Sequence, residues 1–153
     1  MAISPDYRDL LSAFNGAEVR YLVVGAHAVS FHAEPRFTVD LDLWIQATLG
    51  NARKVRSALS AFGAPLRRIA VKDFATPGLV YQIGVEPVRI DILTSIAGVE
   101  FRDAYRSRIE CMYGDIPIPI ISIEHLIAAK KAAGRPQDLL DLNALLMNRR
   151  GRR

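Results

Sequence analysis

A short strand-like run ends at a glycine, and a second one carries two acidic residues, within the stretch from residue 23 to residue 45. The first apolar run, 21–24, stops at Gly25, and the second run, 39–45, carries Asp40 and Asp42. Successive side chains of a strand point to opposite faces, so these two carboxylates share one face while their apolar neighbours can enter a core. Carboxylates are poor strand formers and repel each other, so this face is either solvated or holds something positive.

A third acidic residue follows the same pattern further along the chain. In the apolar run 88–93, Asp91 lies between Ile90 and Ile92, which are expected to face the core. If the two acidic strands are neighbours, three carboxylates converge on one open face of the sheet. Oxygen ligands of this kind suit hard divalent cations such as Mg²⁺ or Mn²⁺. A merely solvated acidic face is the alternative interpretation, since antiparallel sheets often expose one polar face.

The glycine that ends the first run suggests a place for phosphate. Gly25 and Ala26 stand where a predicted strand gives way to a predicted helix. Free backbone N–H groups and the helix dipole favour an anion at such a helix start. Since Gly25 has no Cβ, a phosphate can approach the backbone closely there. The sequence therefore predicts a phosphate site about a dozen residues before the acidic pair.

The remaining periodicities predict one α+β domain over residues 1–148. Its sheet is expected to be mixed but mostly antiparallel, with flanking helices and a C-terminal pair of helices. We predict helices at 5–16, 26–33, 51–62, 122–133 and from 136 onward, strands at 21–24 and 39–45, a hairpin of 80–85 with 88–93, and two short strands within 109–121. The stretches 64–78 and 94–106 show no clear pattern.

The composition excludes several classes of protein. Half of the 153 residues are hydrophobic, which indicates a globular chain, but no apolar run has the length of a membrane helix. With one cysteine, Cys111, and no secretory pattern, we expect a cytoplasmic protein without an internal disulfide.

The net charge of +4 is matched by four arginines within residues 149–153. Without them the charges balance, so no pervasive phosphate-binding surface is implied. We expect 149–153 to be a disordered basic tail. RNA binding by this tail is a weaker alternative.

Together these residues resemble a known superfamily. The series Val24-Gly25-Ala26, then Asp40-Leu41-Asp42, then Asp91 is similar to the nucleotidyltransferases related to DNA polymerase beta. The fuller form, with Arg36 before the acidic pair and Lys130, Arg135, Asp138 and Asp141 near the end, looks like the small branch of AbiEii-type toxin nucleotidyltransferases. The resemblance covers roughly residues 5 to 147.

The resemblance implies a role for each matching residue. Asp40, Asp42 and Asp91 would bind the metal ions, and Asp91 would also activate the acceptor hydroxyl. Gly25 and Ala26 would hold the phosphates of a nucleoside triphosphate, which Lys130 would reach. Arg36 would either brace the Asp40 and Asp42 pair or bind phosphate. One position departs from the pattern. Ala26 stands where the family has Gly or Ser, so a hydroxyl is missing there while the backbone N–H remains.

The implied reaction is Mg²⁺-dependent transfer of a nucleoside monophosphate from an NTP to an acceptor hydroxyl. The acceptor could be a tRNA end, a protein or a small molecule, and the resemblance alone suggests a toxin role with an antitoxin partner; a homodimer is also conceivable. The alternative is a catalytically silent member that binds a nucleotide or a partner.

Some residues have ordinary structural readings. For Arg36 and Lys130, a plain surface position or an ion pair is the alternative to a role in binding phosphate. For Asp138 and Asp141 we favour helix capping and ion pairs over chemistry. Trp44, on the acidic side of its strand, either walls the cleft or packs in the core.

Overall fold

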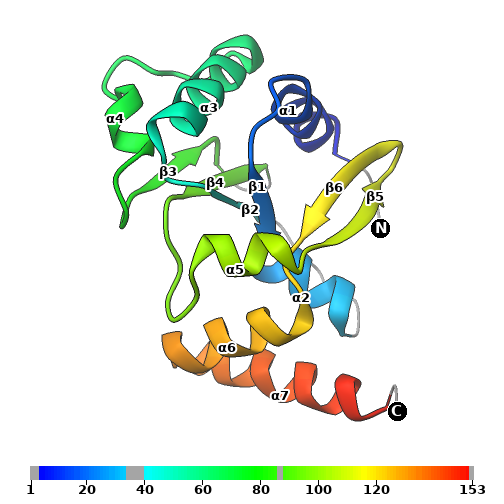
Figure 1. The fold of residues 1–153 in the computed structure, drawn as a ribbon. Helices are drawn as coiled ribbons and strands as arrows, with labels where there is room; N and C mark the ends of the chain where they lie inside the picture. Colours follow the sequence, from blue (N-terminus) through cyan, green and yellow to red (C-terminus); the bar gives the residue numbers. More distant parts are fainter. Residues whose placement is uncertain (1–3, 34–39, 86–87, 152–153) are drawn as a thin grey trace.

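A six-stranded mixed sheet forms the centre of the protein. In the computed structural model, which describes residues 4–33, 40–85 and 88–151, the strand order is β3-β4-β2-β1-β6-β5 (Figure 1). The strands are β1 (Tyr21–Val24), β2 (Asp40–Ile45), β3 (Val80–Ile83), β4 (Arg89–Leu93), β5 (Ile109–Tyr113) and β6 (Ile116–Ile120). Three pairs are antiparallel, while β1 with β6 and β2 with β4 are parallel. The predicted fold class is confirmed.

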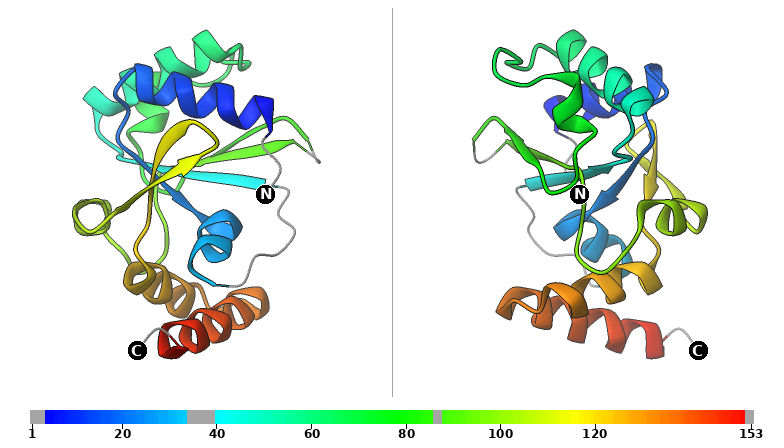
Figure 2. Two further views of the ribbon diagram at one scale, coloured as in Figure 1. Left: turned by 90° about the vertical axis from the view of Figure 1, so that its right-hand side faces the viewer. Right: turned by 60° about the vertical axis from the view of Figure 1, so that its left-hand side comes forward.

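Helices cover both faces of the sheet (Figure 2). On one face lie α1 (Pro5–Gly16) and α3 (Leu49–Phe62), with the short α4 (Val71–Phe74) beside α3. On the other face lie α2 (Gly25–His32), α5 (Phe101–Arg106), α6 (Ile123–Ala133) and α7 (Pro136–Gly151). Helices α6 and α7 pack against each other and form the predicted C-terminal pair.

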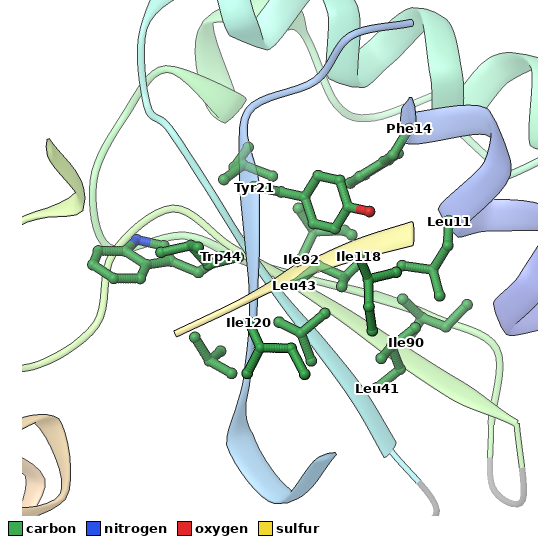
Figure 3. Packing of buried hydrophobic residues seen from close by; sticks show 14 of the residues in the cluster. Leu11, Phe14, Tyr21, Leu41, Leu43, Trp44, Ile90, Ile92, Ile118 and Ile120 are labelled. Atoms are coloured by element: carbon green, nitrogen blue, oxygen red, sulfur yellow. The ribbon is translucent and has the colours of Figure 1, made fainter. Parts of the chain in front are cut away.

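The core fixes which face of β2 and β4 carries the acids. Leu41 and Leu43 of β2 and Ile90 and Ile92 of β4 are buried and cluster with Leu11 and Phe14 of α1 (Figure 3). Because side chains alternate along a strand, burial of these four aliphatic residues turns the intervening polar residues to the opposite face, toward α2, α6 and α7. Burial of apolar area therefore selects the register that presents the acidic face.

The structure corrects the sequence prediction at several points. The short helices α4 and α5 lie in stretches where no pattern was evident, because one or two helical turns carry too few residues to show a period. Helix α7 continues to Gly151, so the tail expected from residue 149 is helical there, and Arg149 forms an ion pair of 2.8 Å with Glu124. Among the described residues, no helix combines the length and apolar character needed to cross a membrane.

Candidate active site

The two predicted acidic strands are direct neighbours in the sheet. Strands β2 and β4 run parallel, and their register places Asp42 opposite Asp91 and Asp40 opposite Arg89. Opposed residues on neighbouring strands point to the same face, so all four side chains share the face that looks toward α2, α6 and α7. This is the convergence that the sequence predicted for the acids, with Arg89 as an additional member.

Gly25 brings the start of α2 against the acidic pair. Its φ is +67°, a left-handed conformation that favours glycine, and a Cβ placed on it would lie 2.1 Å from Oδ2 of Asp42. The glycine is therefore required both by its own backbone and by the carboxylate beside it. The first backbone N–H groups of α2 consequently lie close to the Asp42 side chain.

A cavity of about 700 Å³ joins these parts. Asp42 and Asp91 line it from the sheet, and Gly25 and Ala26 line it from the start of α2. Its opposite wall comes from α6, α7 and the turn between them, and includes Lys130, Arg135, Gln137, Asp138 and Asp141. Asp40 lies on the same sheet face as Asp42 but does not line the cavity.

Arg89 is a residue of this face that the sequence analysis missed. Its guanidinium donates two hydrogen bonds to the Asp91 carboxylate, from Nε to Oδ1 at 3.2 Å and from Nη2 to Oδ2 at 3.0 Å. Such a two-point contact is the strong form of an Arg–carboxylate pair. The signal was present in the sequence, since residues 89 and 91 are two apart on one predicted strand and therefore share a face.

The acidic face holds negative charge that is only partly neutralised. Burial, together with the neighbouring Asp91 and Asp40 carboxylates, raises the pKa of Asp42 to about 6. The Oδ1 atom of Asp40 is buried and accepts no hydrogen bond from any described residue. The described residues contain no group of three His, Cys, Asp or Glu side chains already gathered closely enough to hold a metal ion. The carboxylates are therefore near one another without forming a closed cage.

Lys130 is held by acidic residues of α7. Its Nζ lies 3.2 Å from Oδ1 of Asp138 and 3.0 Å from Oδ2 of Asp141, and all three side chains are at least 87% buried. Arg135 also binds Asp138, through Nε at 2.6 Å and through its backbone N–H at 3.1 Å. The Arg135 guanidinium lowers the pKa of Asp138 to about 2. The capping and ion-pair roles favoured for Asp138 and Asp141 agree with these contacts.

Two further site predictions have different outcomes. Arg36 lies outside the described residues, so its place relative to the acids stays a prediction. Trp44 is 2% exposed and packs edge-to-face on Phe101, with ring centroids 5.1 Å apart. Of the two readings of Trp44, core packing is therefore the correct one.

Comparison with known proteins shows which proteins share this architecture. Residues 9–151 match the model of a family described as nucleotidyl transferase AbiEii toxin, type IV TA system. No curated protein sequence matches this chain significantly.

Three solved structures have a similar fold. A candidate nucleotidyltransferase of Thermotoga maritima, TM1012, has a TM-score of 0.62 and 18% identity over 95% of both chains. The lincosamide antibiotic adenylyltransferase LnuA, bound to lincomycin, has a TM-score of 0.57 and 18% identity over 95% of this chain and 98% of its own. The antibiotic-resistance factor ANT(2'')-Ia has a TM-score of 0.57 and 12% identity over 94% of this chain and 80% of its own.

These identities are too low to show more than a shared fold, whereas the family model spans almost the whole chain. The protein therefore belongs to the AbiEii nucleotidyltransferase toxin family.

Proposed function

We propose that this nucleotidyltransferase moves a nucleoside monophosphate from an NTP to an acceptor hydroxyl in a reaction that depends on Mg²⁺ or Mn²⁺. One observation carries the proposal. Asp42 and Asp91 lie side by side on β2 and β4, and Asp42 also abuts Gly25, so these two acids and the start of α2 share one cavity. The proposed cation site and the proposed phosphate site would thus adjoin, as nucleotidyl transfer requires.

The residues present fit a divalent cation. Asp40 has a buried carboxylate oxygen that accepts no hydrogen bond within the described part of the chain. Burial, together with the nearby Asp91 and Asp40 carboxylates, raises the pKa of Asp42, so this side chain holds its proton more tightly than usual. Both features describe a site short of positive charge, and carboxylate oxygens are the ligands that Mg²⁺ prefers. Asp40, Asp42 and Asp91 would hold the ion, with the Arg89 guanidinium giving up part of its contact with Asp91.

The start of α2 would bind the phosphates. Gly25 and Ala26 line the cavity and offer backbone N–H groups at the positive end of the helix dipole. Ala26 adds no hydroxyl, so binding at this position relies on the backbone alone. Lys130 lines the same cavity, and we assign it an electrostatic role toward the triphosphate, exerted while it stays paired with α7. Arg36 is assigned a bracing or phosphate-binding role.

The reaction breaks one phosphorus–oxygen bond and forms another, and the acceptor hydroxyl loses its proton. The acceptor oxygen gives its proton to Asp91, or to water held there, and attacks the α-phosphorus of the NTP. The bond from the α-phosphorus to the bridging oxygen of the β-phosphate breaks, and pyrophosphate leaves with the electron pair. A bound divalent cation would supply charge stabilisation to the attacking and leaving oxygens. The chain itself contributes positioning and a fixed electrostatic environment.

The family supports a toxin role with an antitoxin as partner. The acceptor class stays open between a tRNA end, a protein and a small molecule; LnuA is an adenylyltransferase for a lincosamide antibiotic. A homodimer is the other partner that we propose.

The direct test is transfer of label from an α-labelled NTP to total RNA or protein of a cell lysate, or to an aminoglycoside, in the presence of Mg²⁺. We expect Asp42→Asn to abolish label transfer, because the substitution removes the central charge of the acidic face. The matched control is Asp103→Asn, an equal change at an exposed position of α5. Transfer that survives Asp42→Asn, or that ignores removal of divalent cations, contradicts the proposal.

A catalytically silent nucleotide-binding or partner-binding member is the second candidate. The Arg89–Asp91 pair favours it, because a guanidinium already neutralises the third acid, and so does the missing hydroxyl at Ala26. Mg²⁺-dependent binding of an NTP analogue without label transfer to any acceptor would support this candidate.

A further inference from the structure

A second cavity, on the other side of the sheet, is lined by basic side chains. Arg56 of α3, Arg67 and Arg68 of the α3–α4 connection, and Lys72 of α4 line a hollow of about 590 Å³. We call these four residues the basic hollow. Three of them are exposed, and Arg56 is half-buried. None of the residues of the candidate active site lines it.

The charge of this region is strongly one-sided. Residues 46–79 contain six basic residues and one acidic residue, a net charge of +5, so the rest of the chain, with its four C-terminal arginines, sums to −1. The near-balanced charge of the whole chain outside its C-terminal arginines therefore conceals one strongly basic segment. A cluster of like charges raises the local potential and attracts polyanions.

Acidic side chains of the described residues do not form ion pairs with the cations of the basic hollow. Among the described residues, none of the four forms an ion pair. The one carboxylate nearby, Asp73, accepts a hydrogen bond of 2.7 Å from the backbone N–H of Ala70 and caps α4. Four cations close together without counter-ions repel one another, which indicates a surface that meets anions from outside.

Edge strand β3 contacts both α4, which helps to line the basic hollow, and the active-site cavity. Strand β3 is the outermost strand of the sheet on this side. Val80 of β3 lines the active-site cavity, whereas Tyr81 contacts Phe74 of α4 with ring centroids 5.9 Å apart. A long anionic chain that passes the edge at β3 can therefore touch the basic hollow and still reach the cavity.

We infer that the basic hollow docks the phosphate backbone of an RNA acceptor. This inference rests on the proposed function and deepens it, since it names the class of acceptor. Guanidinium groups form two-point contacts with phosphates, and the lining contains no aromatic ring to stack on a base. Binding is thus to the backbone and independent of sequence. A protein partner would demand an exposed apolar centre, but only Ala70 among the exposed lining residues is apolar.

The test is fluorescence anisotropy of the full chain with a labelled single-stranded RNA of about 20 nucleotides, measured over a series of salt concentrations. Arg67→Gln with Arg68→Gln is the test variant. Arg102→Gln with Arg106→Gln, on exposed positions of α5, is the control with the same loss of charge. We expect the test variant to bind roughly tenfold more weakly and to lower the salt slope by about 1.4, at about 0.7 per lost contact. The control variant should bind as the unmodified protein does.

The outcomes separate this inference from the proposed function. Equal binding by test and control variants, or no RNA binding at all, overturns the inference, and nucleotidyl transfer to a protein or small molecule would then leave the proposed function standing. Displacement of the RNA by polyglutamate of equal charge at equal concentration overturns it in favour of an acidic protein. Weaker binding by the test variant alone, with no transfer to any acceptor, supports the docking surface and counts against the proposed function.

Discussion

At the residue scale, Gly25 is the position where a substitution should do most damage to the proposed site. We expect Gly25→Ala to cost about 1–2 kcal/mol of unfolding free energy, because alanine is strained at a φ of +67°, and to displace the Asp42 carboxylate, because the new Cβ would lie 2.1 Å from Oδ2. Urea unfolding and label transfer measure the two effects. Gly50→Ala in α3 is the control, since no neighbouring atom comes within 4 Å of a Cβ there. Equal behaviour of the two variants would contradict the tight approach at Gly25.

The Asp42 carboxyl group gives a second prediction at this scale. Its pKa is about 6 in the folded protein, against an ordinary value of 3.8. Between these two pH values, the carboxyl group is therefore mostly protonated in the folded state and mostly ionised in the unfolded state. The contribution of this group to the free energy of unfolding is therefore fully present below about pH 4 and is lost as the pH rises through 6. We expect Asp42→Asn, in the absence of divalent cations, to gain stability over the unmodified protein across that range, up to about 3 kcal/mol. A difference that does not change between pH 4 and pH 7 would refute the prediction.

At the element scale, the junction of α6 and α7 depends on one buried cation. Lys130 separates the Asp138 and Asp141 carboxylates, which are 2% and 4% exposed. Lys130→Met would leave two buried carboxylates with less compensation, and we expect a loss of about 3 kcal/mol or more in unfolding free energy. Lys131→Met, at the neighbouring exposed position, should change it by less than about 0.5 kcal/mol. Loss of label transfer without loss of stability would mean that Lys130 serves the substrate only.

The elements also show what the sequence can predict. The alternation in β2 and β4 predicts their acidic face because burial of Leu41 and Ile90 leaves no other register. The spacing of Arg89 and Asp91 on one strand also places them on one face. The pairing of Lys130 with Asp138 and Asp141 instead depends on how α6 and α7 pack, which no local pattern encodes. The short helices α4 and α5 likewise form because the rest of the chain positions them.

At the scale of the whole molecule, the sheet keeps the two proposed binding surfaces apart. The active-site cavity draws on β2, β4, α2, α6 and α7, whereas the basic hollow draws on α3, α4 and their connection. A ligand that fills the cavity thus ties together elements from the whole length of the chain. If the chain is one domain, as we predict, such a ligand must stabilise the entire fold in a single unfolding transition.

Thermal unfolding with Mg²⁺ and a non-hydrolysable NTP measures this linkage. A ligand at 100 times its Kd adds about 2.7 kcal/mol, which corresponds to a rise of roughly 5–10 °C in Tm for a chain of this length. We expect Asp42→Asn to lose the shift and the paired Arg67→Gln and Arg68→Gln variant to keep it, because the basic hollow does not border the cavity. The opposite pattern would place the nucleotide in the basic hollow. Two separate transitions, of which the ligand moves one, would mean that α6 and α7 unfold independently of the sheet.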